Sequence, residues 1–248
     1  MAEPAPWERE TWVDEGPLRE IAEQATDRAQ RDAAPRRRRA ELDAEVMADV
    51  QREAGARAAR FNERLLSASE ALGRGRYDDA RRMVAPVLRD LPQIALAHEI
   101  AGLSFYGVGQ WRKAAAELEQ ARQLEHSTRL HAVLADCYRA LRRYDMVEQL
   151  WLELRAASPS HELMAEGRIV AAGALADQGD LRGALKLLER ARSVPDTPRD
   201  YHLRQWYVLA DLLDRSGDIV EARRYFTLVA RVDSDFSDVK QRLAALGR

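Results

Sequence analysis

The sequence predicts an all-α fold, a solenoid of about five helical hairpins with a helical extension before them and a capping helix after them. A short sequence marker recurs five times at intervals of 33 to 38 residues, which is typical of stacked helical repeats. Apolar residues make up 46% of the chain and are mostly Ala and Leu. Runs of β-branched residues that alternate with polar ones are missing, so we expect helices and no sheet.

The marker begins with a turn residue, followed two positions later by a bulky residue and three positions after that by a small one. In the clearest copy these are Gly109, Trp111 and Ala114. The third copy departs from the pattern, because Arg142 stands in the turn and Val147 replaces the small alanine. We expect this third hairpin to pack less well. The bulky residues of the five copies are Tyr77, Trp111, Tyr144, Leu181 and Ile219.

The stretch 95–128 indicates how one repeat folds. Apolar residues between positions 100 and 105 share one face of a first helix, and those of the second helix recur at steps of three and four residues. Residues 107–110 are expected to form the turn, where Gly109 supplies backbone freedom. Small side chains should let the two helix axes approach closely, namely Ala101, Gly102 and Ala114.

Residues 1–39 form an acidic segment that we expect to be largely disordered or marginally helical. Residues 1–34 carry nine acids against four arginines. Trp7 and Trp12 are unusual in such a segment, and they either pack against the protein's own hairpins or belong to a short motif that docks on a partner. The segment ends in a run that either contacts RNA phosphates or an acidic partner, or is a solvated linker: Arg36, Arg37, Arg38 and Arg39.

The array of hairpins needs a cover at each open end. Residues 40–60 have a helical pattern with Gly55 as a break, and they are expected to cap the first hairpin. The solenoid then occupies 61–248, and a helix over 237–247 is expected to close it. In that last helix the apolar side chains should face the last hairpin and the charged ones should face water, with Ser237 or Asp238 as the N-cap.

The hairpins themselves are expected at about 61–94, 95–127, 128–162, 163–200 and 201–234. Pro92 and Pro159 each lie 15 residues after a bulky marker residue, and each should stop a second helix.

With these features the chain resembles the tetratricopeptide repeat family over about 61–235. The matching residues are the five markers, the helix-ending prolines and small residues in the first helices, which are Gly102, Ala135, Ala172 and Ala210. More narrowly, the stretches 135–141, 166–181 and 238–246 resemble a group of actinobacterial tetratricopeptide-repeat proteins. The resemblance implies a right-handed superhelix whose first helices line a concave groove for an extended or helical peptide.

The register of the family places a set of side chains of mixed charge in that groove. Arg and Tyr are enriched at interface hot spots, so Arg129, Arg139, Arg204 and Tyr207 are the strongest candidates for partner contacts. One branch of the family grips a C-terminal carboxylate with Lys and Asn, and those residue types are missing here. The predicted groove residues are Glu99, Leu103, Tyr106, Arg129, Asp136, Arg139, Glu166, Gly173, Asp177, Arg204, Tyr207, Asp211 and Asp214.

Composition and motifs argue against several other classes of protein. The net charge of −2 argues against a strongly basic nucleic-acid binder. The single cysteine, Cys137, allows no disulfide within the chain and is expected to be a buried structural thiol. The N-terminal residues lack a charged and then apolar secretory pattern, and no apolar run is long enough to span a bilayer. We therefore expect a cytoplasmic protein.

The sequence holds no recognisable catalytic or cofactor motif. The five histidines include no pair spaced for one metal on a helix face, and there is no glycine-rich phosphate loop. We expect neither enzymatic activity nor a cofactor or metal. The predicted function is that of a protein-interaction scaffold that binds a peptide or helix in its groove, or whose groove its own N-terminal segment occupies. The alternative is an RNA- or ribosome-associated protein that uses Arg36 to Arg39.

Overall fold

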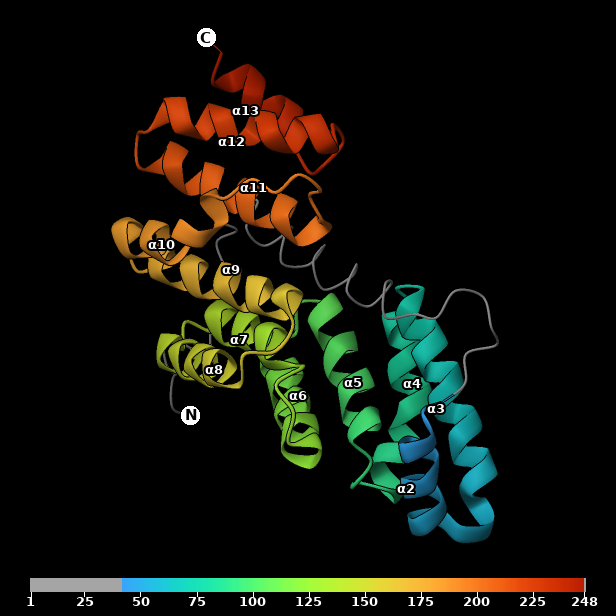
Figure 1. The fold of residues 1–248 in the computed structure, drawn as a ribbon. Coiled ribbons are helices and arrows are strands. Elements are labelled where there is room, and N and C mark those ends of the chain that lie inside the picture. Colours follow the sequence, from blue (N-terminus) through green and yellow to red (C-terminus); the bar gives the residue numbers. More distant parts are fainter. Residues whose placement is uncertain (1–41, 248) are drawn as a thin grey trace, which may run out of the picture.

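The computed structural model describes residues 42–247 of the chain. These residues form helices joined by short connections and contain no strand, which confirms the predicted all-α class. The helices follow one another in chain order along an elongated stack, with α2 at one end and α13 at the other (Figure 1). None of the helices within 42–247 combines the length and the apolar character that crossing a membrane requires.

The described helices fall into pairs of a first and a second helix. The first helices are α3 (Ala58–Gly73), α5 (Ala95–Gly107), α7 (His131–Ala140), α9 (His161–Asp177) and α11 (Asp200–Arg215). The second helices are α4 (Tyr77–Asp90), α6 (Trp111–Glu125), α8 (Tyr144–Ala157), α10 (Leu181–Leu187) with the 3-10 helix η3 (Glu189–Arg192), and α12 (Ile219–Val232). The pairs are preceded by α2 (Ala44–Ala54) and η2 (Gly55–Arg57), and followed by α13 (Val239–Ala245).

The recurring marker lies where each second helix begins. Its bulky residue is the first residue of α4, α6, α8, α10 and α12. The turn glycines of four copies, such as Gly109 at φ 73°, adopt the left-handed conformation that glycine reaches without a steric penalty. In the third copy Arg142 adopts φ 57° instead, so a side chain occupies a position that favours glycine.

The expected helix ends agree with the structure apart from a few residues. The helices α4 and α8 end at Asp90 and Ala157, two residues before Pro92 and Pro159. The C-terminal helix is shorter than the predicted 237–247. The helix α5 includes Gly107, which we had assigned to the turn, and the ring of Tyr77 packs against this residue and leaves no room for a side chain.

Glycines bring neighbouring helices close together inside the stack. A Cβ atom added at Gly102 of α5 would lie 2.7 Å from Cγ of Leu118 in α6, as expected from the small residues of this hairpin. A Cβ atom at Gly107 would lie 2.3 Å from Cζ of Tyr77. Since real Cβ atoms do not approach that closely, each glycine allows a contact that alanine would block.

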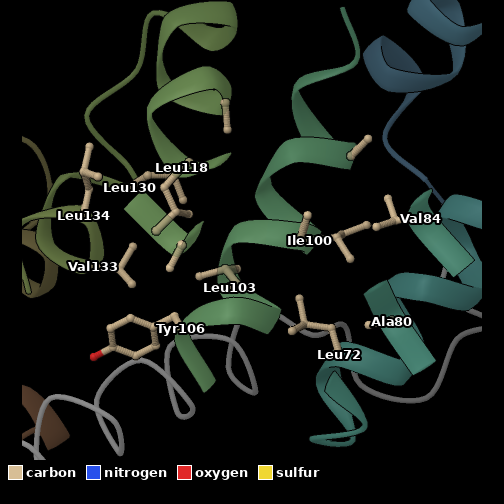
Figure 2. Packing of buried hydrophobic residues seen from close by; sticks show 14 of the residues in the cluster. Leu72, Ala80, Val84, Ile100, Leu103, Tyr106, Leu118, Leu130, Val133 and Leu134 are labelled. Carbon is tan, nitrogen blue, oxygen red and sulfur yellow. The ribbon is translucent and has the colours of Figure 1, made fainter. Parts of the chain in front are cut away.

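The core runs along the stack from Val50 of α2 to Val239 of α13. Figure 2 shows part of this core. Ile100 points toward Val84 of α4, and Leu103 points in the other direction, toward α6 and α7. The core has two large parts and a small one, and α9 contributes buried residues to all three. The helix α9 therefore joins the two halves of the stack.

Candidate functional site

The predicted groove residues carry polar contacts between consecutive first helices. Each of the eleven charged or tyrosine side chains in that set contacts another part of the chain, and most of the partners lie 30 to 38 residues away. That separation is about one repeat. We call these contacts the inter-repeat ladder. Its steps join consecutive first helices, or the loop just before one, and the last step joins α11 to the C-terminal helix α13.

The first step joins α5 to the start of α7. Arg129 donates through Nη2 to a carboxylate oxygen of Glu99 at 2.7 Å, and the same nitrogen lies 3.0 Å from Glu125. The side chain of Glu99 is 11% exposed and that of Arg129 is 53% exposed. The hydrogen bond to Glu99 is the main cause that raises the pKa of Arg129. Arg129 is thus anchored at its tip and still open to solvent.

The second step runs through four polar side chains from α5 to α9. The hydroxyl of Tyr106 donates to Asp136 of α7 at 2.7 Å, and Asp136 lies 3.6 Å from Arg139. Arg139 donates through Nε and Nη2 to Asp177 of α9, at 2.6 and 3.1 Å. Burial lowers the pKa of Arg139, but its contacts with Asp177 and Asp136 raise it on balance, so the guanidinium stays charged.

The third step joins α9 to α11 through a buried ion pair. Nε of Arg204 donates to Glu166 at 2.7 Å, and the two side chains are 8% and 15% exposed. Burial raises the pKa of Glu166, and the nearby charge of Arg204 opposes that shift. Burial has the larger effect here because both groups have lost most of their hydration.

The last step attaches α13 to α11 and corrects an expectation from the sequence. We expected the charged residues of α13 to face water, but Arg242 donates to Asp211 at 2.6 Å and lies 3.1 Å from Asp214. Asp238 holds the N-cap position of α13, as one of the two predicted candidates, but its side chain makes no capping hydrogen bond and instead accepts one from the hydroxyl of Tyr207 in α11. Burial and this hydrogen bond raise the pKa of Tyr207.

Asp238 and Arg242 are the ladder residues that sequence reasoning missed. Each lies 31 residues after its partner, Tyr207 or Asp211. A search for complementary polar residues one repeat apart would have found them.

A polar hollow of about 370 Å³ lies beside the ladder, between the end of α6, the loop before α7, and α8. Nε2 of the buried His131 lies 3.0 Å from Glu153, while its Nδ1 has no hydrogen-bond partner. Burial lowers the pKa of His131, which favours the neutral imidazole. The hollow is lined by Arg122, Gln123, His126, Ser127, Thr128, His131 and Glu153.

The hollow therefore holds a histidine and a carboxylate, but no hydroxyl or thiol is hydrogen-bonded to the histidine as a nucleophile would be. Cys137 is buried, as expected, and burial raises the pKa of its thiol, which keeps it protonated. Among residues 42–247, no three His, Cys, Asp or Glu side chains gather into a group suited to a metal ion.

Several candidate residues lie outside the described range. Trp7 and Trp12 are among them, and so is the run from Arg36 to Arg39. Their proposed contacts with the hairpins, a partner or RNA stay predictions.

Comparison with known proteins gives no further guide to the function, because no protein-family model and no curated protein sequence matches the chain.

Proposed function

We propose that the chain is a protein-interaction scaffold of the tetratricopeptide-repeat type. In this proposal the helix pairs wind into a right-handed superhelix, and the first helices line a concave surface that binds an extended or helical peptide. The regular pairing of helices, the bulky residue at the start of every second helix and the left-handed turn glycines support the assignment. The family resemblance remains an inference from these repeated features.

The inter-repeat ladder is the observation that carries the proposal. Its steps tie α5 to α7, α7 to α9, α9 to α11 and α11 to α13. Such contacts fix the spacing between consecutive first helices before a ligand arrives, and a preorganised surface loses less free energy on binding. Because most ladder charges are already paired, a ligand would gain most from those that still reach solvent, above all Arg129.

A second part of the proposal concerns what occupies the surface when no partner is present. Residues 1–39, with Trp7 and Trp12, are long enough to lie along several first helices, since an extended chain covers about 3.3 Å per residue. In this regulated form a partner would have to displace the segment.

The proposal is tested by capture of partners from native cell extract on the full chain, on the chain lacking residues 1–41, and on the charge-reversed variant Arg129→Glu. Arg231→Glu is the matched control, because Arg231 is an exposed arginine on the second helix α12. A partner that Arg129→Glu loses and Arg231→Glu keeps supports binding at the first helices. If it binds both variants equally well, the assigned surface is wrong. Stronger capture by the shortened chain supports self-occlusion.

A further inference from the structure

Two arginines lie over the ring of Trp151 where α8 packs against α9, and a third, on η3, is near one of them. The Cζ atoms of Arg155 and Arg168 lie 5.9 and 5.8 Å from the centroid of the Trp151 ring. Arg190, on η3, is close enough that its charge lowers the pKa of Arg168. Within the described part of the chain, none of the three forms an ion pair, whereas every arginine of the inter-repeat ladder faces a carboxylate.

The positive charges at this junction oppose one another. Burial is the main cause that lowers the pKa of Arg168, and Arg190 and Arg155 lower it further. Guanidinium groups stay charged in proteins, so Arg168 keeps its charge while partly buried and under repulsion from the other two arginines. An anion placed among the three would relieve it.

The same charge continues along the neighbouring second helix. Arg182 and Lys186 are four residues apart on α10, which places them on one helix face, and Arg190 follows four residues later on η3. All three side chains are exposed, and in the described structure none has an acidic partner; the nearby Glu189 is bonded to Arg192. We call Arg155, Arg168, Arg182, Lys186 and Arg190 the outer basic surface.

We propose that the outer basic surface binds an acidic segment of a partner protein. Guanidinium groups form paired hydrogen bonds with carboxylates, and Arg155 and Arg190 are exposed and available for such contacts. Arg182, Lys186 and Arg190 recur every four residues along α10 and η3, a spacing that suits an acidic helix whose carboxylates recur at the same interval. Four of the five residues lie on α8, α10 and η3, in the yellow and orange part of Figure 1, and Arg168 lies on α9; none of the five takes part in the contacts that define the inter-repeat ladder.

The surroundings of Trp151 favour a peptide over a nucleic acid. Proteins that bind single strands through basic grooves stack bases on exposed aromatic faces. Trp151 is only 8% exposed, and two arginines already lie over its ring.

The test is the binding of the full chain to a fluorescein-labelled helical peptide with Glu at every fourth position, measured by fluorescence anisotropy. The same peptide with Gln in place of Glu is the ligand control. The Glu peptide should bind at least about tenfold more tightly, and binding should weaken steeply with salt because exposed charges are screened. Equal binding of the two peptides overturns the proposal.

Two double variants locate the site. The variant Arg155→Gln/Arg190→Gln removes two exposed guanidinium groups of the outer basic surface and should weaken binding of the Glu peptide about tenfold or more. The variant Arg60→Gln/Arg231→Gln removes two exposed arginines on α3 and α12 and should leave binding unchanged. Circular dichroism and urea unfolding show whether both variants fold like the wild type. An equal loss in both variants contradicts the assigned site.

Single-stranded RNA of similar length and charge distinguishes the kind of partner. The proposal expects RNA to bind more weakly than the Glu peptide and to be insensitive to Arg155→Gln/Arg190→Gln. If RNA binds more tightly and loses its affinity in that variant, the surface recognises nucleic acid and the acidic-peptide assignment is wrong. Because this surface excludes Arg129, the result is independent of the proposed first-helix function.

Discussion

Arg139 of α7 reaches across Gly173 to bind Asp177 of α9. Its Nε and Nη2 donate to the carboxylate at 2.6 and 3.1 Å, and a Cβ atom at position 173 would lie 2.9 Å from its Cζ. The missing side chain therefore makes room for the guanidinium between the two helices. A glycine and an ion pair together couple consecutive repeats at this point.

The first prediction concerns this coupling. The variant Arg139→Leu should lower the free energy of unfolding by about 3 kcal/mol, because it removes the guanidinium that faces two largely buried carboxylates. These are Asp136 and Asp177, whose side chains are 10% and 17% exposed. Urea unfolding followed by circular dichroism measures the loss. In the background of Arg139→Leu, the further change Asp177→Asn should recover part of it.

The exposed Arg60 is the control for that experiment, since Arg60→Leu changes the same residue type on α3 and removes no ion pair formed among residues 42–247. Surface changes of this kind shift stability by about 0.5 kcal/mol or less. If Arg139→Leu lowers the free energy of unfolding no more than Arg60→Leu does, the ladder contributes nothing to stability at this step.

The second prediction compares two glycines at the same repeat position. Gly73 and Gly107 are the last residues of α3 and α5, 34 positions apart. A Cβ atom at Gly107 would lie 2.3 Å from Cζ of the Tyr77 ring, whereas one at Gly73 would meet nothing within 4 Å. Gly107→Ala should therefore destabilise the protein by about 1 to 3 kcal/mol, as overpacking does.

Gly73→Ala should instead leave stability unchanged or raise it by about 0.5 to 1 kcal/mol, since alanine is the better helix former. Thermal unfolding of both variants gives the comparison. The packing argument fails if the two substitutions shift the midpoint in the same direction by similar amounts.

The sequence predicted the helices well because their signals are local. The bulky residue of the marker and the turn residue before it decide where each second helix begins, and both are visible without knowledge of distant contacts. The end of α5 was placed too early, and the packing role of Gly107 was not predicted. Its role depends on Tyr77, 30 positions earlier, and no local pattern reveals that contact.

The polar residues of the first helices were harder to interpret. Their register placed Glu166 and Arg204 on a shared surface, and we read that surface as a ligand groove. The structure pairs these two side chains with each other at 2.7 Å. Whether a charged residue faces a ligand or the next repeat depends on the distance and crossing angle of two helices, which packing sets. In the outer basic surface, Arg155 of α8 comes near Arg168 of the next pair only through the packing of α8 against α9, which no local pattern reveals.

The third prediction concerns the turn of the third hairpin. Arg142 adopts φ 57°, where the other four turns have glycine, and an L-residue in that region costs about 1 kcal/mol. Arg142→Gly should therefore stabilise the protein by up to about 1 kcal/mol, less the entropy that glycine adds to the unfolded chain. The reverse change in the preceding repeat, Gly109→Ala at φ 73°, should destabilise it by a similar amount. Equal losses for both variants in chemical unfolding would contradict this account.

The fourth prediction is that two histidines give opposite dependence of stability on pH. Nδ1 of His98 lies 2.7 Å from Glu117, and this hydrogen bond raises the pKa of His98 above its usual 6.5. Its contribution is therefore fully present below pH 6.5 and is lost as the pH rises through the raised pKa. Burial lowers the pKa of His131, so its contribution is present above pH 6.5 and is lost as the pH falls.

The measurement is the free energy of unfolding of the wild type, His98→Gln and His131→Gln between about pH 5 and pH 8, the range in which histidine titrates. The difference between wild type and His98→Gln should shrink as the pH rises, and the difference between wild type and His131→Gln should grow. The two variants control for each other, because general effects of pH on the other groups cancel in both differences. Slopes of the same sign would mean that Glu117 does not hold the proton on His98 or that His131 is not kept neutral by burial.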